Sequence, residues 1–296
     1  MPHIHSPARA NVRRLVAVLG LSIGILVVEL AGGLASNSLA LLADAGHVFT
    51  DVAGISLALL AIWFGSRPTS SERTFGYLRL EILAAVANAV LLFAVAAFIL
   101  YEAWRRLSDP PEVASGLMLA VALVGLLING IALWLLHSVQ AESLTMRGAY
   151  LEVAGDAAGS VAVVVAAVVI ALTGRTGADA LASAIIAVLI LPRTWGLLRD
   201  AIDVLLEATP KGIEMTAVRR HILEAPGVAD VHDLHAWSIT SGVNVVSAHV
   251  VLEPGADGAA VLDFLCECLS GDFDIEHSTF QLESSDRRRL EAGSHG

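Results

Sequence analysis

Six long apolar segments occupy the first two thirds of the chain, and they constrain its fold more than any other feature. Each segment is close to or longer than the roughly 20 residues that an α-helix needs to cross a bilayer. The 296 residues are 56% hydrophobic and only 16% charged, which is too apolar for an ordinary soluble domain. We therefore predict an all-α membrane domain of six transmembrane helices within residues 14–206, at about 14–36, 38–65, 80–104, 113–136, 150–174 and 178–198.

Arginines in the polar breaks between these segments indicate the orientation of the chain. With six spans, one side of the membrane carries few of them, namely Arg105, Arg106 and Arg175. The other side carries Arg9, Arg13, Arg14, Arg67, Arg73, Arg79, Arg147 and Arg199. Because the arginine-rich side is usually cytoplasmic, we predict a multi-pass protein with both termini in the cytoplasm. Residues 1–13 then form a cytoplasmic N-terminal tail.

After about Leu206 the composition of the sequence changes from long apolar segments to that of a soluble domain. Turn signals at Pro226-Gly227 and Ser241-Gly242 divide it into short elements. We predict helices at Ile213–Glu224 and Gly258–Leu269, and strands at Val228–Ile239, Val243–Leu252 and Ile275–Glu283. The order α-β-β-α-β predicts a small α+β domain over residues 207–284, with its helices on one face of the sheet. Residues 285–296 are expected to form a disordered tail.

Charge and cysteine content narrow the classes of function. The formal net charge is −11, and much of it comes from the C-terminal domain, so a basic footprint for nucleic acid is absent. The two cysteines, Cys266 and Cys268, lie two residues apart in a predicted helix and offer no disulfide framework. We expect the first span to be retained, because the polar and basic start of the sequence leads into an apolar run longer than that of a cleavable signal. Abundant Ala, Val and Arg with a single lysine indicate a GC-rich bacterial genome, so we expect the bacterial plasma (inner) membrane.

Ionisable side chains occur in pairs inside two of the apolar segments. His47 and Asp51 lie in the second segment, and Glu152 and Asp156 lie in the fifth. The i, i+4 spacing places both members of a pair on one helix face. Ionisable groups cost about 2.5–3.5 kcal/mol each at the centre of a membrane helix on insertion scales. A divalent cation bound between the two helices would offset that cost.

The two pairs can converge as four nitrogen and oxygen ligands, a set that suits tetrahedral Zn²⁺. Small residues near each pair would let the helices approach closely. Asp44 flanks the same side of its helix as His47 and is a possible accessory ligand. The alternative is that these side chains only form buried hydrogen bonds between helices. A metal-dependent intramembrane hydrolase is a different reading, but it usually carries a His-Glu-x-x-His signature, and this sequence has none.

Several motifs resemble the cation diffusion facilitator family, near its zinc-exporting bacterial branch. They are Ser38-Leu39-Ala40-Leu41-Leu42-Ala43-Asp44-Ala45-Gly46-His47 with Asp51, Phe75-Gly76-Tyr77-Leu78-Arg79-Leu80-Glu81, Met146-Arg147-Gly148-Ala149-Tyr150 with Gly155-Asp156, and His232-Asp233-Leu234-His235-Ala236-Trp237. The resemblance implies six transmembrane helices, a cytoplasmic metallochaperone-like (ferredoxin-like) domain, a homodimer in the lipid bilayer, and exchange of a divalent metal for protons.

The sequence departs from the family pattern at one predicted ligand. Zinc transporters of this family usually carry His-x-x-x-Asp on both helices, whereas here the second histidine position holds Glu152. A carboxylate in place of an imidazole moves the ligand set toward oxygen. The site can still bind Zn²⁺, but manganese, iron, cobalt and cadmium become alternative cargoes.

The C-terminal domain holds a second set of candidate ligands. The resemblance places cytoplasmic metal ligands at the positions of His232, His249 and His277, with Glu283 or Asp233 less certain. His235 is a further candidate, but on a regular strand it would point away from His232, so the two cannot bind one ion without a bend. The alternative is that these are surface histidines, or histidines hydrogen-bonded in a dimer interface.

These observations favour a secondary transporter, not an enzyme, that exports a divalent metal from the cytoplasm, with Zn²⁺ as the expected cargo. Ligands that must lose protons to bind metal couple the two ions, so proton antiport follows. The family resemblance also implies that metal in the cytoplasmic domain would tighten the dimer and raise transport. The remaining alternative is a membrane metal sensor that does not transport.

Overall fold

The computed structural model describes residues 7–65, 67–138, 140, 144–275 and 277–285. At residues 7–15, 55, 58–59, 62, 65 and 144–145 it describes the backbone only. The chain divides into two compact units, Met1–Leu59 with Ala87–Leu198, and Leu60–Val86 with Arg199–Gly296.

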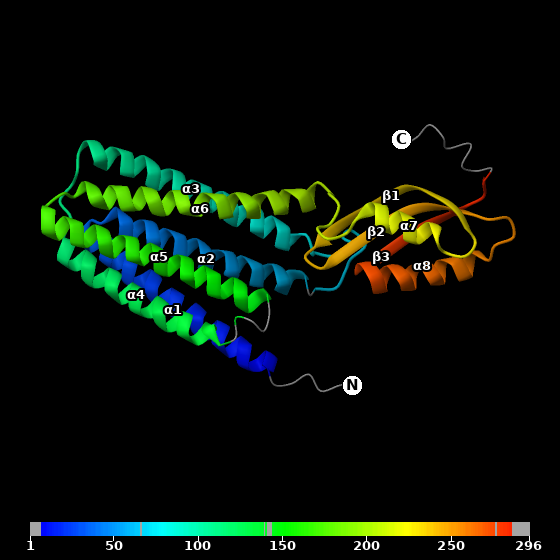
Figure 1. The fold of residues 1–296 in the computed structure, drawn as a ribbon, viewed down its shortest axis with the longest axis horizontal. Helices are drawn as coiled ribbons and strands as arrows, with labels where there is room; N and C mark the ends of the chain where they lie inside the picture. Colours follow the sequence, from blue (N-terminus) through cyan, green and yellow to red (C-terminus); the bar gives the residue numbers. More distant parts are fainter. Residues whose placement is uncertain (1–6, 66, 139, 141–143, 276, 286–296) are drawn as a thin grey trace. The chain divides into compact units, whose positions relative to one another are not determined.

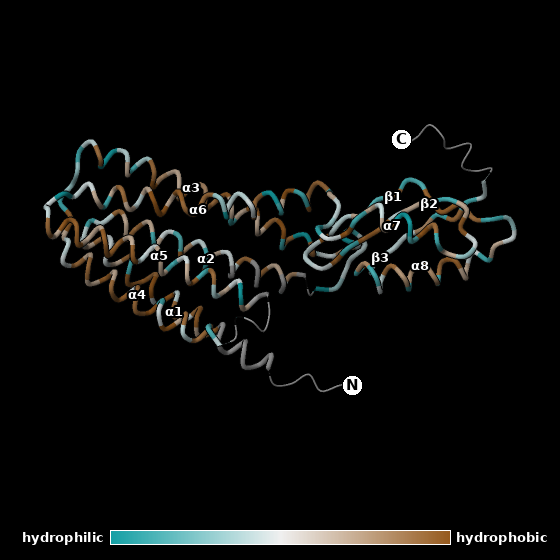
Figure 2. Tube along the Cα trace, viewed as in Figure 1, coloured by the Kyte–Doolittle hydropathy of each residue, from teal (hydrophilic) through white to brown (hydrophobic). Residues whose placement is uncertain are grey.

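The first unit is built from long helices that run roughly along one direction (Figure 1). Figure 2 shows that these helices are apolar over most of their length. The ends of three of them enter the second unit. The helices are α1 (Pro7–Ser36), α2 (Leu39–Gly65), α3 (Leu80–Ser108), α4 (Ser115–His137), α5 (Leu144–Thr173) and α6 (Gly177–Leu205).

Five of these helices are long and apolar enough to cross a membrane, judged over the residues that the structure describes. Those stretches are Val16–Ser36, Leu80–Ser108, Ser115–His137, Met146–Thr173 and Gly177–Leu205. Bulky apolar side chains face outward on them; Leu172 is 81% exposed and Trp134 is 77% exposed. A helix that is apolar on its outer face as well as its inner face suits lipid as its surroundings. The count of six spans stays a prediction.

Several helix ends lie outside the predicted segments. Helix α1 begins seven residues before residue 14, and α5 begins six residues before Tyr150. Helix α6 continues to Leu205, past both Pro192 and the predicted end at residue 198. The apolar pattern identifies only the part of a helix that suits lipid. Helical hydrogen bonding continues into the polar flanks, where the apolar pattern gives no information about the helix end.

Small side chains form much of the interior of this bundle. The largest buried cluster contains Ala40, Ala43, Ala96, Ala122, Ala166, Ala167, Ala182 and Ala187, together with seven larger apolar residues. Small residues let helix backbones approach closely, which is the usual way in which helices pack in a membrane. The close approach brings the polar residues of neighbouring helices within reach of one another.

The start of α2 is fixed by a buried carboxylate from α6. Helix α1 ends at Ser36, and the next residue, Asn37, adopts a left-handed conformation with φ of 57°. Asp179 then accepts hydrogen bonds from the Ser38 hydroxyl (2.6 Å) and from the backbone N–H groups of Leu39 (2.7 Å) and Ala40 (3.1 Å). The first N–H groups of a helix have no partner inside it, so this carboxylate completes the helix end. It also sets the position of α2 relative to α6.

The C-terminal part of the second unit contains a three-stranded mixed sheet with strand order β1-β2-β3. Strands β1 and β2 are antiparallel, and β2 and β3 are parallel. The predicted order α-β-β-α-β is found, while the likeness to a ferredoxin-like or metallochaperone fold stays a prediction. The elements are α7 (Met215–Leu223), β1 (Val228–Thr240), β2 (Val243–Leu252), α8 (Gly258–Phe273) and β3 (His277–Glu283).

Both short helices contribute to one apolar core on the sheet. Val218 and Ile222 of α7 and Leu265 of α8 join Val246 and Val250 of β2 in one buried cluster. Neighbouring residues of a strand point to opposite faces of the sheet. His249 lies between Ala248 and Val250, which are both in this core, so its side chain points away from the core.

The third strand begins later than predicted. Helix α8 continues four residues beyond Leu269 and ends at Phe273, and the next residue, Asp274, has a left-handed conformation that caps the helix. The backbone N–H of Ile275 donates to the carbonyl of Leu269, so Ile275 belongs to the helix end and packs into the core. In the sequence, an apolar residue that packs into the core after a helix cannot be distinguished from the first residue of a strand, which is why the sequence predicts Ile275 in the strand. Of the predicted tail at residues 285–296, all but residue 285 lie outside the described residues.

Candidate metal sites

Three of the predicted intramembrane ligands come together between α2 and α5. The Nε2 atom of His47 lies 3.5 Å from Oδ2 of Asp51 and 3.5 Å from Oδ1 of Asp156. One ligand atom from each residue can be chosen so that all three lie within 4.8 Å of one another. The side chains are 13%, 19% and 11% exposed. One imidazole and two carboxylates at this spacing could hold a divalent cation in common.

The histidine of this group has an unusual environment. Its Nδ1 atom is buried and finds no hydrogen-bond partner among the described residues. The 3.5 Å contacts of Nε2 are longer than the 2.7–3.2 Å of a typical N–H···O hydrogen bond. Hydrogen bonds within the protein therefore do not satisfy this group fully. This argues against the alternative that its side chains only form hydrogen bonds between helices.

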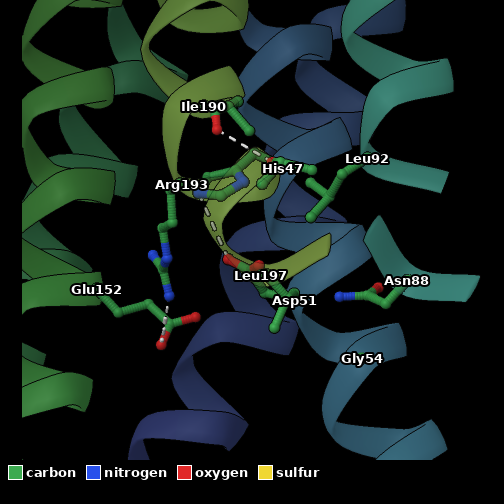
Figure 3. Close-up of a pocket in the computed structure, with 10 residues that line it drawn as sticks. His47, Asp51, Gly54, Asn88, Leu92, Glu152, Ile190, Arg193 and Leu197 are labelled. Atoms are coloured by element: carbon green, nitrogen blue, oxygen red, sulfur yellow. Dashed lines mark hydrogen bonds and ion pairs between the residues drawn. The ribbon is translucent and has the colours of Figure 1, made fainter. Parts of the chain in front are cut away.

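The fourth predicted ligand, Glu152, lies close by but has a different partner. It comes from α5, and its Oε2 atom is 3.3 Å from Nη2 of Arg193 on α6. Figure 3 shows the two side chains reaching toward one another beside His47 and Asp51. Glu152 is not part of the three-residue group. The structure thus places it at the edge of the site and in an ion pair.

Sequence reasoning missed Arg193. The residue lies inside the sixth apolar segment, directly after Pro192. A charged side chain within a membrane helix is a signal of function or of a buried partner. That signal was present in the sequence, although it does not identify Glu152 as the partner.

Two cavities adjoin the group. The first has a volume of about 300 Å³ and is lined by polar residues from four helices, His47, Asp51, Asn88, Glu152, Arg193 and Thr194, together with Gly54 and three apolar side chains. The second is about 390 Å³, mostly apolar, and lies against α1, α2 and α5. Asp51 and Glu152 line both cavities. An ion at the three-residue group would therefore be reachable from either cavity.

Asp44, the possible accessory ligand, belongs to a neighbouring polar cluster and not to the three-residue group. Its Oδ2 atom accepts a hydrogen bond from Ser160 (3.3 Å), and Ser160 accepts one from Asn129 (3.3 Å). A Cβ at Gly159 would lie 2.9 Å from Oδ1 of Asp44, so only glycine leaves room for this carboxylate between α2 and α5. The fully buried Glu29 adjoins the same cluster.

A second group of candidate ligands lies in the C-terminal domain. Glu283 is 2.8 Å from Nδ1 of His249 and 3.3 Å from Nε2 of His232. The three residues come from three strands, and His232 stands opposite His249 in the β1–β2 register. One ligand atom from each lies within 4.8 Å of the others. By strand alternation this group is on the face of the sheet that points away from the helices.

The electrostatics of this group favour an ionised carboxylate. The Glu283 side chain is fully buried, which on its own would raise its pKa. Hydrogen bonds from Gln281 and His232 and the charges of the two histidines outweigh burial, so the pKa of the Glu283 carboxyl lies below its ordinary value. Two imidazoles with one ionised carboxylate are a donor set that suits Zn²⁺. The residues present therefore fit a metal ion.

The remaining predicted ligands of this domain lie outside the group. His235 pairs with Asp233 at 3.0 Å, and Asp233 is also 3.8 Å from Nε2 of His249. A shift in the β1 register falls between His232 and His235, and Asp233 has a φ of 51° there. This irregularity is the bend that two ligands on one strand would need. His277 is exposed, and its ring lies 6.2 Å from that of Phe75.

The sequence matches two family profiles over nearly its full length. The cation efflux transmembrane domain matches residues 15–206, and the cytoplasmic domain of cation efflux proteins matches residues 210–285. The solved metal-bound C-terminal domain of the CzcD transporter from Cupriavidus metallidurans is 39% identical; the match covers 24% of this chain and 99% of that one, with a TM-score of 0.23.

Three curated relatives are similar over nearly the whole chain. The cation efflux system protein CzcD of Alcaligenes sp. (strain CT14) is 43% identical over 99% of this chain and 93% of its own length. The zinc transporter ZitB of Escherichia coli (strain K12) is 41% identical over 94% of this chain and 90% of its own. The cadmium, cobalt and zinc/H(+)-K(+) antiporter of Bacillus velezensis is 38% identical over 96% and 93%.

The family profiles, the relatives and the apolar helices agree on a multi-pass membrane protein that handles divalent metals. They confirm the prediction of a transporter and leave the hydrolase reading without support. The chain belongs to the cation diffusion facilitator family, as a cation efflux transporter and not an enzyme.

Proposed function

We propose that this protein exports divalent metal ions from the cytoplasm in exchange for protons, with Zn²⁺ as its main cargo. The observation that carries the proposal is the buried group of His47, Asp51 and Asp156 between two apolar helices. Such a group is costly in a membrane unless a cation or protons compensate it. The names of the relatives, which include a zinc transporter and a cadmium, cobalt and zinc antiporter, support the same cargo class.

Proton coupling follows from the chemistry of the ligands. An imidazole and two carboxylates bind a divalent ion best after losing their protons. By linkage, external protons that bind these groups weaken the hold on the metal by the same factor. Cytosolic metal would therefore displace protons at the intramembrane group, and protons from outside would release the metal after the helices rearrange.

The placement of the chain in the membrane is part of the proposal. Helix α2, which carries His47 and Asp51, would be the sixth span beside the five apolar helices. An even number of spans puts both termini on the cytoplasmic side of the inner membrane, as the arginine distribution predicts. The C-terminal domain matches a profile for a cytoplasmic domain, which agrees with this orientation.

The group of His232, His249 and Glu283 is proposed to bind a regulatory metal ion. It lies in the domain that matches the cytoplasmic domain of cation efflux proteins. Metal there would stabilise the domain within a homodimer and raise transport when cytosolic metal is abundant.

Glu152 supports a second candidate cargo set, because an added carboxylate favours manganese, iron, cobalt or cadmium more than a histidine would.

Reconstitution with a pH dye inside proteoliposomes tests the proposal. Zn²⁺, Mn²⁺, Fe²⁺, Co²⁺ and Cd²⁺ are added in turn to the purified protein, and metal-triggered proton flux is recorded. We expect flux with Zn²⁺ and its loss in Asp51→Ala, because this change removes a ligand that also carries a proton. Asp109→Ala, at an exposed position after α3, should behave as wild type.

Two results would contradict the proposal. Flux that persists in Asp51→Ala would place the transport site elsewhere. Metal binding without flux for every metal, in a protein that is correctly folded, would favour the non-transporting sensor.

A further inference from the structure

An arginine stands beside the transport group without any role in the proposed function. Arg193 lies inside α6, 16 residues after the start of that helix at Gly177. An arginine at the centre of a membrane helix costs about 2.5–3.5 kcal/mol on insertion scales, so a partner or a water-filled cavity is expected. Arg193 has both, because it lines the 300 Å³ cavity and pairs with Glu152 at 3.3 Å.

The pair occupies the same cavity as the metal ligands. His47 and Asp51 line it together with Glu152 and Arg193 (Figure 3). Glu152 is spaced i, i+4 from Asp156, so the two carboxylates share one face of α5. One carboxylate of that face joins the three-residue group, and the other is held by the guanidinium. Glu152 thus has two possible cationic partners within one cavity.

A guanidinium differs from the other cations that could bind these carboxylates, namely protons and the divalent metal ion. Its charge is delocalised over a side chain that is not deprotonated in proteins, and it cannot leave as a proton can. Its side chain is 60% exposed and that of Glu152 is 32% exposed, so neither is locked in place by packing. The ion pair can therefore open and re-form without disturbing the helix core.

We propose that Arg193 is a tethered cation that competes with the divalent metal for Glu152. When metal enters, Glu152 turns from the guanidinium to the ion; when metal leaves, Arg193 takes the carboxylate back. This exchange weakens metal binding and speeds metal release, so Arg193 is a positioning residue that sets affinity and turnover. The inference rests on the proposed metal site and deepens it.

The exchange makes a specific prediction for removal of the charge. In Arg193→Gln, Glu152 has no competing cation, so Zn²⁺ should bind about tenfold more tightly, within the 5–150-fold range typical of coupling between sites. Turnover at saturating metal should fall, because release becomes slower. A merely structural ion pair predicts the opposite, namely weaker or unchanged binding together with lower stability.

Equilibrium dialysis of Zn²⁺ against the full-length protein in detergent tests this. All variants carry His249→Ala, which removes the C-terminal group as a competing site. Arg193→Lys keeps the charge and should bind metal as the parent does. Arg199→Gln is the matched control, since Arg199 is an exposed arginine on the same helix that pairs with Asp203 at 3.9 Å. It should leave the affinity unchanged.

A second arm uses the Glu152→Gln background, in which Arg193→Gln leaves no unpaired carboxylate. In the Glu152→Gln background the Arg193→Gln change should no longer alter affinity, because the carboxylate for which the cations compete is gone. Unchanged or weaker affinity in folded Arg193→Gln, or an equal effect in both backgrounds, would overturn the inference.

The readout separates this inference from the proposed function. Wild-type protein that binds Zn²⁺ but moves no protons would contradict the proposed export, while the effect of Arg193→Gln on affinity would still decide the role of Arg193. Unaltered affinity in a variant that transports would contradict only the role of Arg193.

Discussion

Within the proposed transport site, Glu152 is the residue that we expect to set the metal preference. The three-residue group supplies one nitrogen and two oxygen ligands, and Glu152 can add only oxygen. Oxygen ligands suit manganese and other hard ions, whereas an imidazole suits Zn²⁺. Whether this carboxylate joins the ion or stays with Arg193 therefore decides how hard the ligand set becomes.

Replacing Glu152 with histidine should shift the metal preference toward Zn²⁺. The added nitrogen would raise the ratio of Zn²⁺ to Mn²⁺ flux by about tenfold, a change of roughly 1.4 kcal/mol in relative binding. Initial rates of proton flux with each metal in proteoliposomes measure the ratio. Glu152→Gln separates loss of the carboxylate from gain of the imidazole. An unchanged ratio in Glu152→His would show that this side chain never contacts the ion.

At this scale the sequence predicts the candidate ligands but not all their partners. The i, i+4 spacing of charged residues in apolar segments suffices to identify both pairs. The pairing of Glu152 with Arg193 depends on how α6 is rotated against α5, and the packing of many apolar side chains decides that rotation. Periodicity within one segment carries no information about the rotation of another.

At the scale of the helices, a buried carboxylate holds the first turn of α2. Asp179 is 1% exposed and accepts three hydrogen bonds at the start of α2. Arg106 lies 3.7 Å from it and offsets its charge. The helix end is therefore fixed to α6, and a shift there would also move His47, two turns further along α2.

Asp179→Ala should destabilise the full-length protein strongly. The change leaves backbone donors and the Arg106 charge without their partner, a loss on the order of 3 kcal/mol for a buried pair. Thermal unfolding in detergent measures it. Asp200→Ala is the control, because that carboxylate is exposed and its pair with Lys211 should contribute less than about 1 kcal/mol. Equal effects of the two changes would contradict the anchoring role of Asp179.

The strand register explains why one predicted ligand lies outside the C-terminal group. His249 of β2 stands opposite Gln281 of β3, and His277 stands opposite Val245. Four residues along a strand span roughly 13 Å, so His277 lies too far along β3 to reach the ion that Glu283 could hold. The sequence predicts the strands well. Their register depends on pairing across the sheet, and the sequence of one strand alone does not determine it.

Acid should weaken the C-terminal domain through Glu283. The pKa of this carboxyl lies below its ordinary value of 4.5, because hydrogen bonds and nearby histidines outweigh burial. A lowered folded pKa means that the ionised carboxyl stabilises the fold above about pH 4.5 and that this contribution disappears as pH falls further. With chelator present, wild-type stability should therefore drop more steeply below pH 4.5 than that of Glu283→Gln. Parallel curves in thermal unfolding would contradict this.

The whole molecule combines two metal groups of different composition. The intramembrane group has one histidine and two aspartates, and the C-terminal group has two histidines and one glutamate. The two groups lie in different compact units and share no residue. The order of the elements is predictable from the apolar pattern and the turn signals. The extent of the two compact units and the two three-residue groups depend instead on packing and register.

Zinc binding by the two groups should therefore be separable in the full-length chain. We expect wild type to bind two Zn²⁺ per chain, and His249→Ala and Asp51→Ala to bind one each, because each change removes a ligand from one group only. Metal at 100 times its Kd stabilises a fold by about 2.7 kcal/mol, so chelation should lower the unfolding temperature of wild type more than that of either variant.

Proton flux then assigns a role to each group. His249→Ala should keep metal-triggered flux, because it leaves the proposed transport group intact, whereas Asp51→Ala should lose it. Equilibrium dialysis and flux measured on the same preparations give both quantities. Loss of flux in a folded His249→Ala protein would place the C-terminal group on the transport route. Retained flux with one bound ion would instead limit that group to regulation, since transport would proceed without it.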